Sequence, residues 1–335
     1  MLTFVLIALV LHIVLVNLAI GLSVTIPILK RRGEVELSKS LMRFYASTYG
    51  LAGVFGTAFT VFLLAFYPSL IGFVGNIAFV PFAISILLIV LHFLSIVLYW
   101  YGWDKFTPET HFYVGMTMAV TAVLIPLGFR AVFGFLNTPL GLELQPKPHL
   151  DVLKALTNPT FLALYPKSIL ASLTLIFTVL SSLRREFAKL AMVTLALTCV
   201  AGMVYAETLI AIPYKFENAV RSPLFYAKMV VVALQFLALA TFVRTGRGSI
   251  LATVCAFMGV ALGELLNAVS QYPYAIADVS ALPKEMLGIV NLSAQNPLTS
   301  GLEAFTWAFL IPLLIASSIL IYLISEPFRS SRTKS

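Results

Sequence analysis

Three ionisable side chains lie inside long apolar runs of the sequence, where each must serve a chemical or structural purpose. They are Arg130, Glu207 and Glu264. An arginine at the centre of a bilayer costs about 2.5–3.5 kcal/mol on insertion scales, and a buried charge without a partner is costly everywhere. Charges at this depth mark proton or ion paths and cofactor sites, so all three are candidate functional residues. The alternative is that two of them form a structural ion pair.

Two histidines, His12 and His92, also lie within apolar runs. Neutral imidazole is a common axial ligand of haem iron, so both residues are candidate haem ligands, His12 more so than His92. A hydrogen-bonded packing role is the alternative for each. His111 begins an apolar run and His149 lies in a connection, and we expect both to be interfacial or solvated. Cys199 and Cys255 lie in apolar runs without a second cysteine nearby, which predicts neither a disulfide nor a zinc site.

The composition defines the class of protein that must position these groups. Hydrophobic residues make up 60% of the 335 positions and charged residues only 11%, whereas soluble domains have roughly 45–50% and 25%. The formal charge of +8 could suggest a nucleic-acid partner. Its lysines and arginines, however, form short clusters between apolar runs of membrane-spanning length, so we expect no nucleic-acid partner and use the clusters to predict topology.

Apolar runs long enough to cross a bilayer as a helix recur nine times, and they predict an all-α, polytopic membrane bundle in one domain over residues 1–335. About two thirds of the 22 lysines and arginines lie in one set of connections, which places the N-terminus outside and the C-terminus in the cytoplasm. The third run is too long for one straight span, and we expect Pro81 to kink it or to separate a short interfacial piece. The expected spans are 2–29, 41–67, 69–101, 111–136, 161–183, 187–212, 224–243, 249–270 and 303–326.

Short motifs occur in a fixed order along nearly the whole chain. They include Leu11-His12, Gly102-Trp-Asp-Lys105 followed by His111, Gly134-Phe-Leu-Asn-Thr-Pro139, Pro223-Leu-Phe-Tyr-Ala-Lys-Met229 and Pro273-Tyr-Ala-Ile-Ala-Asp278. In this order the motifs resemble those of subunit I of the cytochrome bd-type quinol oxidases, which also has nine spans and an outer N-terminus. The resemblance implies that His12 is the haem-ligating histidine of the first helix. It also implies that Met229 is the methionine ligand of the low-spin haem.

The chain departs from the family at several positions that carry its redox chemistry. The resemblance places Lys167 where the low-spin haem has its axial histidine, and a lysine ammonium cannot ligate iron unless it deprotonates, so we expect that haem to be absent. Ile84 and His92 stand where the family has two glutamates. No carboxylate occurs near Ala268, where the family has a further haem-ligating glutamate, unless Glu264 substitutes from one turn away. The long quinol-binding loop is reduced to residues 213–222.

The resemblance implies a subunit of a terminal oxidase complex that oxidises quinol and reduces dioxygen to water. Haem b and haem d are expected in the complex, and whether this chain binds haem is left open. We expect the chain to be the divergent, non-catalytic partner of a haem-bearing subunit I, with small single-span subunits, membrane lipid and quinol also present, in the plasma membrane of a prokaryote. Two alternatives remain: a haem-bearing catalytic subunit with altered ligands, and a transporter or channel that uses Arg130, Glu207 and Glu264.

Overall fold

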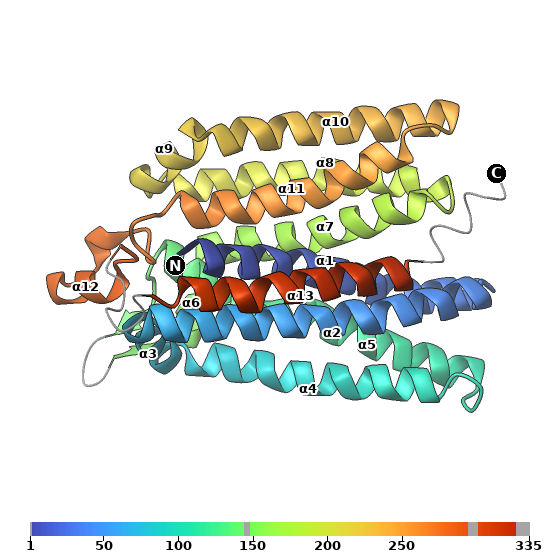
Figure 1. Ribbon diagram of the computed structural model, residues 1–335, viewed down its shortest axis with the longest axis horizontal. Coiled ribbons are helices and arrows are strands. Elements are labelled where there is room, and N and C mark those ends of the chain that lie inside the picture. Colours follow the sequence, from blue (N-terminus) through green and yellow to red (C-terminus); the bar gives the residue numbers. More distant parts are fainter. Residues whose placement is uncertain (1, 144–147, 294–300, 326–335) are drawn as a thin grey trace.

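The structure is a computed structural model that describes residues 2–143, 148–293 and 301–325. Within these residues it is almost entirely helical, and nine helices are long and apolar enough to cross a membrane. The expected all-α bundle with nine spans is therefore confirmed (Figure 1). The nine helices are α1 (Leu2–Arg31), α2 (Val35–Phe66), α4 (Phe79–Tyr101), α5 (Pro108–Asn137), α7 (Pro159–Ser181), α8 (Glu186–Leu209), α10 (Pro223–Thr245), α11 (Ser249–Val269) and α13 (Glu303–Ile324).

The long third apolar run is divided, as expected, but not at the expected residue. A ten-residue helix, α3 (Pro68–Ile77), precedes α4, and the chain turns between them at Ala78. Pro81 is the third residue of α4, a position where the missing backbone N–H has no intrahelical partner to lose. The break therefore comes from the turn at Ala78, and Pro81 lies in the first turn of the spanning helix.

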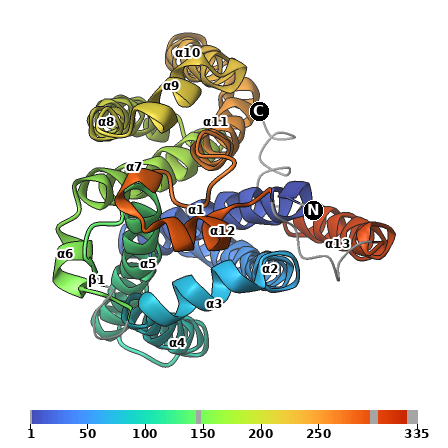
Figure 2. The same ribbon diagram turned by 90° about the vertical axis from the view of Figure 1, so that its left-hand side faces the viewer.

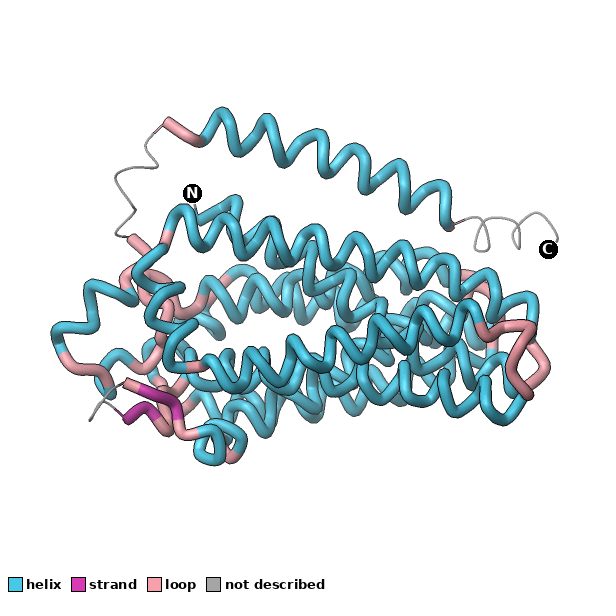
Figure 3. The backbone as a smooth tube through the Cα atoms, turned by 90° about the horizontal axis from the view of Figure 1, so that it is seen from below, coloured by secondary structure: helices cyan, strands magenta, loops and turns pink. Residues whose placement is uncertain are grey.

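The spans form two groups on either side of α1 (Figure 2). One group contains α7, α8, α10 and α11, and we call it the four-helix group. The other contains α2, α4 and α5, with α3 beside them. α1 contacts α2, α5, α7 and α11, and so joins the two groups. α13 lies at the periphery, where Trp307 and Phe309 pack against Phe4 of α1 and Phe62 of α2 (Figure 3).

Short elements cover the end of the bundle at which α1 begins, which we call the outer end after the expected orientation. Two residue pairs, β1 (Leu142–Glu143) and β2 (His149–Leu150), form an antiparallel ladder. The helices α6 (Val152–Leu156), α9 (Pro213–Arg221) and α12 (Leu287–Val290) lie at the same end, together with the 3-10 turns Val279–Ala281 and Lys284–Met286. α6 lies just before α7, the fifth spanning helix.

Large apolar side chains remain exposed along most spans, as expected for helices that face lipid. Examples are Leu87 on α4, Met203 on α8, Leu237 on α10 and Ile315 on α13. Buried polar side chains instead gather between the helices. The bundle is therefore apolar outside and partly polar inside, which is the arrangement that allows it to hold charged groups at membrane depth.

Candidate functional site

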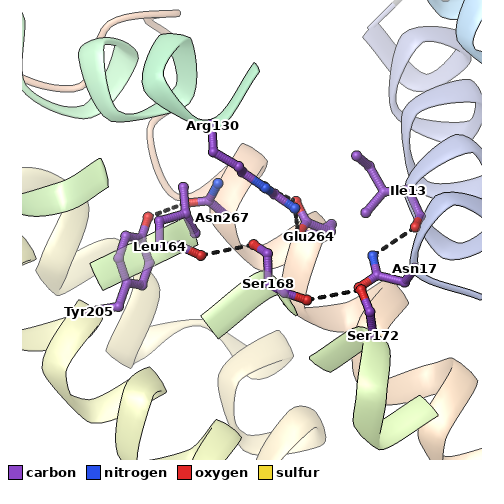
Figure 4. A network of polar contacts seen from close by, with 9 residues as sticks. All are labelled: Ile13, Asn17, Arg130, Leu164, Ser168, Ser172, Tyr205, Glu264 and Asn267. Carbon is purple, nitrogen blue, oxygen red and sulfur yellow. Dashed lines mark hydrogen bonds and ion pairs between the residues drawn. The ribbon is translucent and has the colours of Figure 1, made fainter. Parts of the chain in front are cut away.

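Arg130 and Glu264 form an ion pair between α5 and α11. The guanidinium donates from Nη2 to Oε1 over 2.7 Å and from Nη1 to Oε2 over 3.3 Å (Figure 4). The two side chains are only 5% and 15% exposed. Such a two-pronged contact is the strongest geometry available to an arginine and a carboxylate, and it keeps two charges together at membrane depth. The ion-pair alternative for these two residues is therefore confirmed.

Two lysines of the four-helix group lie near this pair, one on α7 and one on α10. The Lys167 ammonium lies 4.6 Å from the centre of the Tyr205 ring. Lys228 reaches Gly263, the residue before Glu264, so closely that a Cβ at position 263 would be 3.3 Å from Nζ. Both lysines thus point between the helices. Tyr205, from α8, completes the set of side chains contributed by all four helices.

A third lysine, Lys215 of α9, is fully buried in a cage of amide oxygens. Its ammonium donates to the side-chain oxygens of Asn137, Asn267 and Gln271. Tyr205 donates its hydroxyl proton to Asn267, which links the cage to the four-helix group (Figure 4). Burial lowers the pKa of Lys215 from 10.5 to about 7. Sequence reasoning missed this residue because Lys215 lies in a short connection, where a lysine is ordinarily solvated.

His12 is held by one ring nitrogen and leaves the other available. Nδ1–H donates to the carbonyl oxygen of Ala52 on α2 over 2.8 Å. The ring packs against Gly56, where an added Cβ would be 2.8 Å from Cε1. Within the described residues no group bonds to Nε2, which carries the lone pair in this tautomer. A backbone carbonyl on one nitrogen and a free lone pair on the other is the arrangement typical of a metal-ligating histidine.

His92 and His111 have partners at both ring nitrogens. His92 accepts from the hydroxyl of Tyr45 at Nε2 and donates from Nδ1 to Thr121 over 2.9 Å. His111 donates from Nε2 to the carbonyl of Tyr99 and accepts at Nδ1 from Lys30. Neither ring has a lone pair free for iron. His92 therefore has the packing role that the sequence left open, and His111 is buried rather than interfacial.

Two other candidate residues lie away from these groups. Met229 follows Lys228 on α10, but its side chain is 43% exposed and faces outward. Glu207 is exposed near the outer end of α8, so its expected burial inside the chain is wrong. Both helices have a narrow buried face, and a single sequence does not show which face that is. No group of three or more histidine, cysteine or acidic side chains converges within the described residues.

These features define a class: a multi-span helical membrane protein with an internal ion pair, internal lysines and one histidine whose second ring nitrogen is available to bind a metal. Residues 3–212 match the family described as cytochrome bd terminal oxidase subunit I. The chain belongs to this family, and it is a subunit of the bd oxidase type.

The fold agrees with that assignment. A structure described as bd oxidase from Geobacillus thermodenitrificans superimposes on the chain with a TM-score of 0.81, at 15% sequence identity and with 96% of each chain covered. At this identity the likeness concerns the fold alone. No curated protein sequence matches the chain.

Proposed function

We propose that this chain is the divergent partner of a haem-bearing subunit I in a bd-type quinol:dioxygen oxidoreductase, and that the partner carries out the chemistry. The supporting observation is the interior of the four-helix group. At the position that the resemblance assigns to the axial histidine of the low-spin haem, the chain has Lys167, whose ammonium lies on Tyr205. An ammonium has donors only and no lone pair for iron.

The residues of the four-helix group do not fit a six-coordinate haem. Such a haem needs two donor atoms that face one another across the iron. Lys167 points between the helices, whereas Met229 faces outward and is 43% exposed. Glu264 cannot replace the missing ligand as it stands, because Arg130 binds both of its oxygens. We derive no redox step through this part of the chain.

The residues at His12 fit one haem iron. Haem, when bound, supplies dioxygen binding and one-electron chemistry. The contribution of this chain would be to hold the iron through Nε2 of His12, with the ring oriented by the carbonyl of Ala52. Gly56 provides the space for the ring. A single retained haem of this kind is compatible with the partner role, because electron entry from quinol would still need the other subunit.

The outer surface supports placing quinol oxidation on the partner. The resemblance implies a long quinol-binding loop after the sixth spanning helix, and this chain has α9, a nine-residue helix, in its place. Lys215 fixes α9 onto α5 and α11 through three amide oxygens. We propose that the quinol site and the haem b and haem d that carry out the chemistry belong to the partner subunit, apart from at most one haem at His12, with small single-span subunits completing the complex in the plasma membrane of a prokaryote.

The decisive experiment is a reduced-minus-oxidised optical spectrum with haem extraction, on the chain alone and on whatever co-purifies with it from native membranes. We expect the haem of the complex to persist mainly in the partner, with at most one haem per copy of this chain that is lost in His12→Ala. Two or more haems in the isolated chain would contradict the partner role and favour a catalytic subunit with altered ligands. No haem in either sample would contradict the oxidase complex and favour a transporter.

A further inference from the structure

The charged side chains between α5 and the four-helix group do not balance. In their protonated forms Arg130, Lys167 and Lys228 carry three positive charges, against one negative charge on Glu264. Both oxygens of Glu264 are already engaged by Arg130. Within the described residues neither lysine forms an ion pair or donates a hydrogen bond, and their contacts are the Tyr205 ring and Gly263. Each of the two ammonium groups therefore has no hydrogen-bond acceptor among the described residues, which is costly away from water.

Lys215 shows how this chain provides hydrogen-bond acceptors for a buried lysine from its own side chains. Three amide oxygens surround its ammonium, one for each N–H donor. Within the described residues no amide, hydroxyl or carboxylate oxygen accepts a hydrogen bond from Lys167 or Lys228. Both side chains also remain partly exposed, so the surrounding helices do not close over them. The missing acceptors are therefore best supplied by a bound molecule.

The number and type of free donors indicate the chemistry of that molecule. Each ammonium has three donors, and Arg130 uses only two of its five N–H groups on Glu264. A ligand with several oxygens around one centre can accept from all three residues, whereas a halide offers a single contact point. Its negative charge would also offset the excess of two positive charges. We propose that Lys167, Lys228 and Arg130 form a binding site for a phosphate group between α5 and the four-helix group.

The depth of the site is compatible with two sources of phosphate. Lys228 is five residues after the start of α10 and Lys167 is eight residues after the start of α7, which places their Cα atoms about 8–12 Å from the outer helix ends. A phospholipid headgroup entering from the outer leaflet and free inorganic phosphate from the aqueous side offer the same oxygens. The experiment separates them.

The test measures the thermal unfolding midpoint of the detergent-solubilised full chain at constant ionic strength. Inorganic phosphate replaces chloride in one arm, and mixed micelles with phosphatidylglycerol replace neutral detergent in the other. The variants are Lys167→Met and Lys228→Met, which retain the apolar length of the side chain, with Lys215→Met as the matched control. We expect the midpoint of the unsubstituted chain to rise by roughly 3 °C or more at saturating ligand.

The proposal requires that this rise disappear in Lys167→Met and in Lys228→Met and persist in Lys215→Met. A rise with inorganic phosphate identifies the free ion as a ligand, and a rise with phosphatidylglycerol alone identifies a lipid headgroup. A rise of the same size in all three variants would reduce the effect to a general influence of the buffer or micelle and overturn the proposal. So would the absence of any rise in either arm. Neither result depends on haem, so the oxidase role is tested separately.

Discussion

The bundle has two polar interiors, and they accommodate buried polar side chains in different ways. Around His92, the groups contributed by α2, α4 and α5 are neutral, and Tyr45 and Thr121 occupy both ring nitrogens. Between α5 and the four-helix group the side chains are charged, and within the described residues two ammonium groups have no hydrogen-bond acceptor. A neutral network whose donors and acceptors match needs nothing more, whereas an unmatched charged one needs a ligand or a partner. The balance of donors and acceptors, rather than polarity alone, distinguishes packing from function in this chain.

The largest effect is expected from Glu264→Gln in the charged interior. Among the described residues this change removes the one carboxylate beside Arg130, Lys167 and Lys228, and it leaves the three basic side chains together. Loss of one partner from a buried pair costs about 3–5 kcal/mol of unfolding free energy. Arg130→Met should cost clearly less, because either lysine can then pair with Glu264. Denaturant unfolding in detergent measures both. Equal losses for the two variants would show that the lysines do not act on Glu264, and would weaken the contrast between the interiors.

The neutral interior should respond less strongly. His92→Leu leaves the hydroxyl of Tyr45 buried without its partner, which costs about 1–3 kcal/mol. The double variant His92→Leu with Tyr45→Phe removes both groups and should recover much of the loss. The same unfolding measurement checks both variants, and a haem spectrum of His92→Leu identical to that of the unsubstituted chain is expected. A spectral change would mean that His92 acts on a haem, contrary to the packing role.

The contrast between the interiors could be predicted from the sequence only in part. Apolar runs of about 20 residues identify spanning helices because the bilayer thickness fixes their length. That constraint correctly gave the nine spans and marked Arg130 and Glu264 as residues in need of partners. It does not give rotation about the helix axis. Glu207 and Met229 lie in equally apolar runs, yet both face outward.

Contacts between residues on helices that are distant in the sequence could not be predicted from the sequence either. The tautomer of His12 depends on a carbonyl 40 residues away, and that of His92 depends on Thr121. The cage around Lys215 combines one side chain of α5, one of α11 and one that follows the end of α11. No local spacing encodes these contacts. The family resemblance added an expectation that periodicity could not give, because it placed Lys167 at the position of the axial histidine.

Lys215 allows a test of a charged group that does have acceptors. Burial lowers its folded-state pKa to about 7 from 10.5, so between these values the unfolded chain binds the proton and the folded chain does not. Stability then rises with pH across this window, by at most about 1.4 kcal/mol per pH unit. The unfolding free energy of the unsubstituted chain minus that of Lys215→Met should therefore increase from pH 7 to pH 10 and be level below pH 7. A difference that falls with rising pH would show that the cage raises the pKa.

The smallest effect is expected from Glu207→Gln, which is the same chemical change as Glu264→Gln at an exposed position. Glu207 is exposed on α8, and no ion pair or hydrogen bond involves its side chain within the described residues. Surface substitutions of this kind usually change the unfolding free energy by less than about 0.5 kcal/mol. The isolated chain should show that small change. If Glu207→Gln also lowers the recovery of the complex while leaving the isolated chain unchanged, Glu207 contacts the partner subunit. A loss of unfolding free energy as large as that of Glu264→Gln would instead mean that Glu207, although exposed, also balances the charge of the internal lysines.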